Sequence, residues 1–318
     1  MVHHAVLLMA VGSAPILLDM PPRLMWGWEP KVSGYCGSVS VQTAGLYYGN
    51  YLSEGKVRSS ASGGVNAAHQ LLIGYETDIA VRGASVHDAC HALGMNCSMW
   101  DYNKEPSPQH AAFVAWAADA IDAGEPVIAG VYWGVEDDDD YDHIVPLVGY
   151  ERQGGGAISA LYFNDLHTNA TLRGELTTFV QTRRGCDSSE RFGPHSFCLP
   201  RATNYGVVVH GNQDTRGELL PLRLSTDLWT EPDYSKEDKQ HEAPVSLSAT
   251  VTASGLSSGS TYALLRFEDF TTVPHEDFLQ GPFASKIEFV AARDGTHNER
   301  VTFMSNSTTL FRCVLVRH

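Results

Sequence analysis

The sequence predicts an α+β chain in which a region of helices and adjacent strands is followed by an all-β sandwich. Segments with helical features come first: 37–52, 84–93 and 107–123. Apolar, β-branched runs follow directly, an order that favours antiparallel strands over repeating βαβ units: 126–133, 143–151 and 157–163. From residue 206 onward the chain shows almost no helical periodicity and consists of short apolar runs between Gly, Ser and Asn turns, which is typical of a sandwich.

The ends of these elements carry their own signals. The first helical segment has an apolar side along its length, and Gly94 ends the second. The third begins with Ser107 as its cap and Pro108 in its first turn, and Gly124 ends it. A glycine-rich turn at 153–156 joins the last two strands of this region. We therefore expect two domains, 20–200 and 206–318.

Composition limits the classes of function. The chain has 318 residues, of which 43% are hydrophobic and 19% charged, an ordinary globular balance. Its net charge of −15 argues against binding to nucleic acids or anionic membranes, which attract basic faces. No window reaches the roughly 18 apolar residues that a membrane-spanning helix requires. We therefore expect no nucleic-acid partner and no membrane span.

The N-terminus has two readings. Residues 1–19 contain a short apolar run followed by small residues, as in a secretory signal peptide, although the stretch lacks Lys and Arg. The alternative is a buried first strand. Three glycosylation sequons, which start at Asn96, Asn169 and Asn306, also favour an extracellular protein or one in the lumen of the secretory or lysosomal pathway.

The six cysteines suggest two disulfides and two thiols. Cys90 and Cys97 are placed to bridge across a helix end, and Cys186 and Cys198 to close an irregular loop. Cys36 and Cys313 remain, and an unpaired thiol in an oxidising compartment is a candidate reactive group. The alternative is that all six are reduced and buried as small hydrophobic residues.

Cys36, His143 and an Asn-Asp pair form a candidate catalytic set. Cys36 directly precedes the first helix, where the helix dipole and free N–H groups favour a thiolate. His143 opens an apolar strand and is placed to exchange a proton with that thiol. Asp165 and Asn164 end the next strand, where either side chain can orient the histidine.

In this order, with a Gly-x-Pro-Val-Ile strand at 124–128 and a Val-Gly-Tyr strand end at 148–150, the chain resembles the papain-like cysteine peptidase superfamily, and in particular the bacteriocin-leader-processing peptidases. The resemblance covers roughly residues 25–170. It implies a papain-like domain with Cys36 as nucleophile, His143 as base and Asp165 as orienting residue, with Asn164 as the alternative.

One part of the family pattern is missing. The family usually has a Gln about six residues before the cysteine, whereas this chain has Pro30 there. Glu29 and Tyr35 are the candidates to complete the oxyanion hole. Trp28, Gly34 and Asp142 are candidates to line the substrate cleft. The acidic run 136–140 beside Asp142 has three readings: a solvated loop, a cluster that stabilises the thiolate–imidazolium pair, or a site that selects basic groups in the substrate.

The expected function is hydrolysis of peptide or amide bonds through a thioester, and the expected partner is a peptide or protein substrate. Two alternatives stay open on the same residues: acyl transfer to an amine, or an inactive papain-like module used for binding. The sandwich is expected to dock a cell surface, a polymer or a partner. No cofactor and no metal are expected, since the histidines form no metal-ligand pattern with the cysteines; His87 and His91 are expected on the surface.

Overall fold

The structure is a computed structural model, and it describes residues 14–20, 22–23, 35–61, 70–73, 83–132, 143–153, 156–166, 170–176, 197–226 and 246–316. It is mostly β, with 43% strand and 21% helix arranged as several sheets and few helices. The sheet-rich part of the predicted class is therefore confirmed. None of the helices in the described ranges is long and apolar enough to span a membrane.

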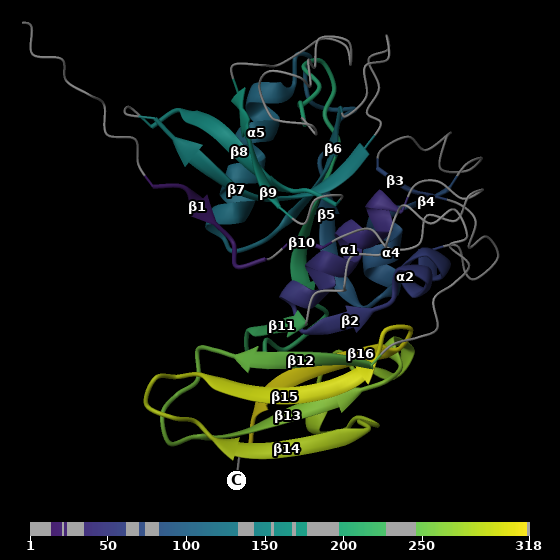
Figure 1. Ribbon diagram of the computed structural model, residues 1–318, viewed down its shortest axis with the longest axis vertical. Coiled ribbons are helices and arrows are strands. Elements are labelled where there is room, and N and C mark those ends of the chain that lie inside the picture. The colour runs from purple at the N-terminus through teal and green to yellow at the C-terminus, as the bar shows by residue number, and fades with distance from the viewer. Residues whose placement is uncertain are drawn as a thin grey trace, which may run out of the picture.

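The first sheet contains seven strands, all antiparallel to their neighbours (Figure 1). Their order across the sheet is β5 (Met95–Met99), β10 (Gly206–Asn212), β6 (Val127–Val131), β7 (His143–Arg152), β8 (Ile158–Asn164) and β9 (Thr171–Glu175). The short strand β1 (Ile16–Leu17) pairs with β7 through Tyr150 and Gly149. A signal peptide that ended at residue 19 would remove β1, whereas cleavage after Ala14 would keep it.

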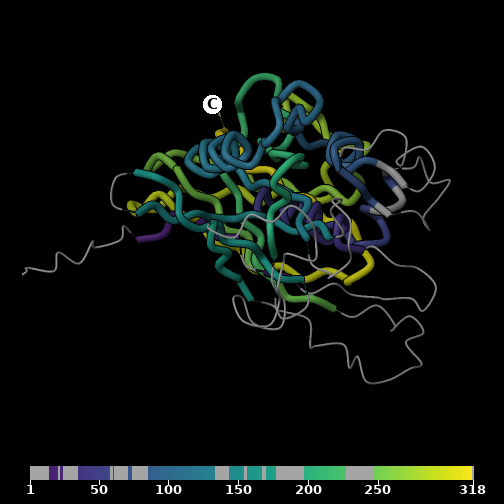
Figure 2. Tube along the Cα trace, turned by 90° about the horizontal axis from the view of Figure 1, so that it is seen from above, coloured from purple at the N-terminus to yellow at the C-terminus, as the bar shows by residue number. Residues whose placement is uncertain are grey.

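Helix α1 (Cys36–Tyr47) lies inside the molecule, and all twelve of its residues are buried. A helix without a polar face is stable where its whole circumference is covered by other elements. Helix α5 (His110–Asp122) instead buries one side and lies at the outside, as the two views show (Figures 1 and 2). Gly124, with φ of +80°, ends α5 as the sequence predicts.

Two further α-helices among the described residues pack against α1. They are α2 (Glu54–Ala61) and α4 (Val86–Ala92). The side chain of Ser85 caps α4 by accepting a hydrogen bond from the His87 N–H. A short parallel pair, β3 (Gln70–Leu72) and β4 (Gly83–Ser85), lies beside them.

The C-terminal region forms two further antiparallel sheets. One contains β11 (Leu222–Thr226), β12 (Ser246–Ala253) and β15 (His297–Met304). The other contains β14 (Ser285–Val290), β13 (Thr261–Phe267), β16 (Thr308–Leu315) and β2 (Asn50–Leu52). Leu224 and Val251 from the first sheet and Leu264 and Phe311 from the second share one apolar cluster. The two sheets therefore enclose a common core, as in a sandwich.

The strand pairing differs from the predicted boundary at residue 206. Strand β10, expected to start the second domain, pairs with β5 and β6 in the first sheet. Strand β2, expected as the end of the first helix, pairs with β16 (Figure 1). Helix α1 ends at Tyr47, and Gly49 adopts a φ of +78° that reverses the chain before β2 begins. Each region thus contributes one strand to the other.

A buried polar network joins the two regions where these strands meet. Arg312 on β16 donates to Oδ1 of Asn50 at 2.7 Å, and the Asn50 amide donates to Oδ1 of Asn212 at 2.6 Å. Asn212 in turn donates to the backbone oxygen of Tyr48 at 2.8 Å. Burial lowers the pKa of Arg312 to about 9. Because buried polar groups are costly without partners, this network fixes the strands in register.

Candidate functional site

Cys36 is the first residue of α1 and is 9% exposed. The preceding residue, Tyr35, occupies the N-cap position without a side-chain hydrogen bond to the helix, and its carbonyl accepts the first helical bond from the N–H of Val39. The N–H groups of the first turn point out of the helix end at Cys36, where the dipole is positive. This end of α1 therefore favours negative charge on the sulfur.

Gly37 allows a close approach at the same place. A Cβ atom on this residue would lie 2.7 Å from the carbonyl oxygen of Leu71 on β3. Because it has no side chain, Gly37 admits the backbone of β3 beside Cys36. Gly34, the other flanking glycine, lies outside the described residues.

His143 is the first residue of β7 and is 5% exposed. It pairs with Val131 on β6. Its ring stacks on that of Phe197, with centroids 5.5 Å apart and planes inclined at 30°. Cys198, which follows Phe197, forms two backbone hydrogen bonds with Tyr132, the residue directly after β6. A segment more than fifty residues away in the sequence thus covers the imidazole.

Helix α1 packs against β7, which brings the two predicted catalytic residues into one region. Ser40 lies one helical turn after Cys36 and donates from Oγ to the backbone oxygen of Ile144 at 3.3 Å. Ile144 directly follows His143. Since one turn of helix rises about 5.4 Å, the start of α1 and the start of β7 adjoin.

The sheet register distinguishes Asp165 from Asn164. Leu147 on β7 is opposite Phe163 on β8, and side chains alternate between faces along each strand. His143 shares the face of Leu147, and Asp165, one residue beyond the end of β8, shares the face of Phe163 when the alternation is continued. Phe197 contacts both His143 and Phe163, in agreement with this assignment.

Asn164 has a structural task on the other face. Its side-chain amide donates to the backbone oxygen of Met20 at 2.8 Å, and its Oδ1 accepts from Oγ1 of Thr171 at 2.9 Å. Both functional atoms of the side chain are therefore engaged. Asp165 is fully buried and its N–H donates to the carbonyl of Ala170 at 2.8 Å. This arrangement favours Asp165 over Asn164 for the orienting role.

Several predicted residues fall outside the described part of the chain. These are the cleft and oxyanion candidates Trp28, Glu29, Gly34 and Asp142, the acidic run 136–140, the sequon at Asn169 and Cys186. Tyr35 is described and packs against the core beside Cys36. Asn96 and Asn306 are exposed, so both sequons are accessible for modification.

The predicted Cys90–Cys97 disulfide is wrong, because both residues are free thiols. Cys90 is a buried residue of α4 and Cys97 is half-buried on β5, and the two side chains are hydrogen-bonded instead of covalently joined. Cys198 is disulfide-bonded, and its predicted partner Cys186 is not described. Cys313 is free and fully buried, and burial raises its pKa to about 12. Of the two cysteines predicted to be unpaired, Cys36 is therefore the better candidate for a reactive thiol.

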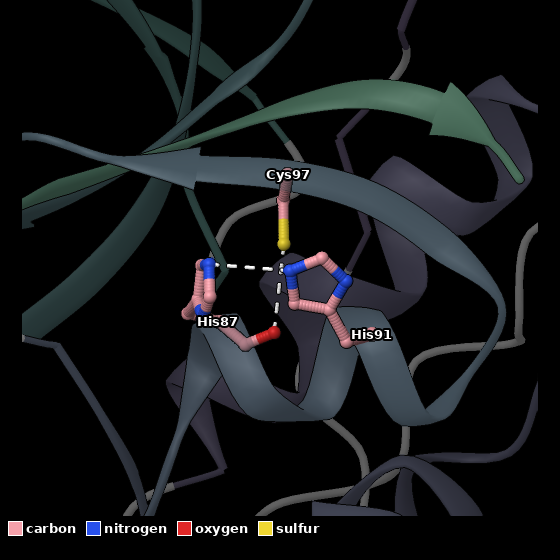
Figure 3. Close-up of side chains that lie close together, drawn as sticks. All are labelled: His87, His91 and Cys97. Atoms are coloured by element: carbon pink, nitrogen blue, oxygen red, sulfur yellow. Dashed lines mark hydrogen bonds between the residues drawn. The ribbon is translucent and has the colours of Figure 1, made fainter.

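The structure also brings together three residues that the sequence analysis left separate. His87 and His91 on α4 and Cys97 on β5 point toward one another, with their ligand atoms within 4.8 Å (Figure 3). Partial burial, followed by the neighbouring His87, lowers the pKa of His91. The one available sequence signal was the i, i+4 spacing of the two histidines. The sulfur joins them only because the chain reverses at Gly94.

Comparison with known proteins gives no relative for this chain: no family model, curated protein or solved structure matches it. The functional argument therefore rests on the residues and their geometry.

Proposed function

We propose that this protein is a papain-like cysteine hydrolase that cleaves peptide or amide bonds, with Cys36 as nucleophile, His143 as general base and Asp165 as the residue that orients His143. The observation that supports this most strongly is the Ser40–Ile144 hydrogen bond, which joins α1, one turn after Cys36, to the start of β7. The shared face of His143 and Asp165 adds the third residue.

The proposed reaction follows from these positions. His143 takes the proton of the Cys36 thiol, and the sulfur attacks the carbonyl carbon of the substrate. Negative charge then develops on the carbonyl oxygen, next to the N–H of Cys36 at the positive end of α1. His143 returns its proton to the departing amine as the C–N bond breaks, which leaves a thioester. Water activated by His143 hydrolyses the thioester, releasing the acid and restoring the thiol.

Two features support a secretory location within this proposal. Cys198 is disulfide-bonded, and disulfides form and persist in oxidising compartments. The sequon residues Asn96 and Asn306 are exposed. Mass spectrometry of protein made in a eukaryotic secretory host tests this location, because glycans at these two positions are expected there.

The catalytic pair is tested by the rate at which iodoacetamide alkylates Cys36 at different pH values, measured by mass spectrometry. In the wild type, Cys36 is expected to react at pH values well below ~8.5, the pKa of a free thiol. In His143→Ala that reactivity is expected to disappear, while His275→Ala, which removes an exposed histidine, leaves it unchanged. Cys313 provides an internal reference, since burial keeps it protonated at neutral pH.

The outcomes separate the competing functions. An inert Cys36, or one that titrates as a free thiol with and without His143, refutes the hydrolase and leaves the binding module as the explanation. If the pair is active, product analysis with an added amine decides between hydrolysis and acyl transfer. Release of free acid supports the proposal, and a dominant amide product assigns a transferase.

A further inference from the structure

The hairpin formed by α4 and β5 holds three side chains with the chemistry of a transition-metal site. His87 and His91 are four residues apart on α4, so they lie on one helix face. The N–H of Gly94, with φ of +73°, donates to the carbonyl of His91 and reverses the chain into β5. Cys97 then projects from β5 toward both rings (Figure 3).

The two imidazoles have the separation that a shared metal requires. Their Nε2 atoms are 3.2 Å apart, and the rings meet edge to face with centroids 4.5 Å apart. Two nitrogen ligands at about 2.0–2.1 Å from a tetrahedral Zn²⁺ lie about 3.3 Å from each other. An ion between the rings can therefore bind both nitrogens without a change in the backbone.

A neighbouring carboxylate favours the ligating tautomer of His87. Oδ1 of Asp88 lies 3.5 Å from Nδ1 of His87. When Nδ1 carries the proton near this carboxylate, the lone pair of Nε2 faces His91 and Cys97. Such carboxylate–histidine contacts orient the histidine ligands of zinc and raise their basicity.

The sulfur completes the donor set. Cys97 Sγ lies 3.5 Å from the backbone oxygen of His87, and its side chain is also hydrogen-bonded to the buried Cys90. A Cys97 thiolate bound to a metal keeps a hydrogen-bond donor in the thiol of Cys90. Cys90 therefore supports the ligand Cys97 through a hydrogen bond and is not itself one of the three ligands.

We propose that His87 Nε2, His91 Nε2 and Cys97 Sγ bind a zinc ion, with water at the fourth position. Two imidazoles and one thiolate suit a borderline-soft ion, whereas Ca²⁺ and Mg²⁺ require oxygen ligands. His91 is exposed, so the fourth position faces solvent. Binding releases the thiol proton of Cys97 and joins α4 to β5, the connection for which the sequence analysis expected a disulfide.

The test uses the full chain with Cys36→Ala, so that zinc cannot bind at the proposed catalytic thiol. Metal is removed by a chelator under reducing conditions, and Zn²⁺ binding is measured by isothermal titration calorimetry. One zinc per chain is expected. Cys97→Ser and the double variant His87→Ala/His91→Ala are expected to weaken binding at least about 100-fold. His275→Ala, at an exposed histidine elsewhere, is the matched control and should bind as the parent does.

Co²⁺ substitution identifies the ligands directly. The parent is expected to show thiolate-to-cobalt charge transfer and the intense visible bands of tetrahedral cobalt, and Cys97→Ser should lose the charge transfer while circular dichroism shows that it stays folded. Zinc binding that persists in both Cys97→Ser and His87→Ala/His91→Ala overturns the proposal. So does a Cys90–Cys97 disulfide in non-reduced protein, detected as a cross-linked Cys90–Cys97 peptide by mass spectrometry after digestion, or a marked preference for copper with a blue thiolate–copper band.

Discussion

The ring of Phe197 stacks on the ring of His143, with centroids 5.5 Å apart. Phe197 comes from a distant segment that Cys198 ties to Tyr132 through two backbone hydrogen bonds. In the proposed enzyme this contact limits rotation of the imidazole and excludes water from one of its faces. Phe197 is therefore a positioning residue for the base.

Replacement of Phe197 is expected to affect catalysis more than folding when the volume is largely kept. Phe197→Leu should lower kcat by about 10²-fold, the order of loss caused by a small misplacement of a catalytic group, with little change in KM. Phe197→Ala should in addition lower the free energy of unfolding by about 3–5 kcal/mol. Steady-state kinetics and denaturant unfolding of both variants measure these effects. An unchanged kcat in Phe197→Leu argues that the stacking has no role in catalysis.

Asp165 and Asn164 are adjacent, and they are expected to fail in different ways. Asp165→Asn should leave a folded protein and lower kcat by about 10⁴-fold, as expected when a base loses the group that sets its tautomer. Asn164→Ala breaks the bonds to Met20 and Thr171 and should lower the free energy of unfolding by about 1–3 kcal/mol while the folded fraction stays active. Kinetics and urea titration compare the pair. The reverse pattern would assign the orienting role to Asn164.

Local signals account for the elements that the sequence predicted correctly. Helices α1, α4 and α5 and strands β6, β7 and β8 have apolar patterns and end residues, such as Gly94 and Gly124, that act over a few neighbouring positions. The predicted cap Ser107 is wrong, because α5 begins at His110 with Gln109 at its N-cap. The pairing of β10 was missed because an apolar run predicts a strand but not its partner. Strand β2 was missed because its residues continue the apolar side of the predicted first helix. Pairing is decided by contacts between residues far apart in the chain.

The same distinction applies to the sites. Cys36 and His143 could be proposed from the sequence because the order of their flanking elements is itself a signal. The preference for Asp165 over Asn164 required the register between Leu147 and Phe163. The His87–His91–Cys97 cluster required the turn at Gly94, since no known spacing motif contains these three residues.

Cys313 is expected to make stability fall at alkaline pH. Burial raises its pKa from 9.0 to about 12, so between these values the unfolded chain has lost a proton that the folded chain retains. The contribution of Cys313 to the free energy of unfolding is fully present below pH 9. It decreases as the pH rises, by at most about 1.4 kcal/mol per pH unit. The difference in unfolding free energy between wild type and Cys313→Val, measured against pH, isolates this contribution. A difference that stays constant from pH 9 to 12 contradicts it.

The exchange of strands predicts that the C-terminal region does not fold alone. A fragment of residues 206–318 lacks β2, whose Tyr51 is fully buried against Phe303 and donates to the backbone oxygen of Ser305 at 2.7 Å. It also leaves β10 without β5 and β6. The fragment is expected to show no cooperative unfolding transition, whereas the full chain should unfold in one transition.

Hydrogen exchange on the full chain decides whether the exchanged strands couple the two regions or whether the regions are independent domains. If the exchange of strands couples the regions, amides of β6 and β13 are protected by the same opening free energy, and Tyr51→Ala lowers both by about 3–5 kcal/mol. A second probe is Tyr262→Ala, which removes a tyrosine of the sandwich core that takes no part in the exchanged strand pairing. If the chain opens as one unit, this variant should also lower the protection of β6 amides. A fragment that folds, or a loss of protection confined to β13, shows instead that the regions are independent domains.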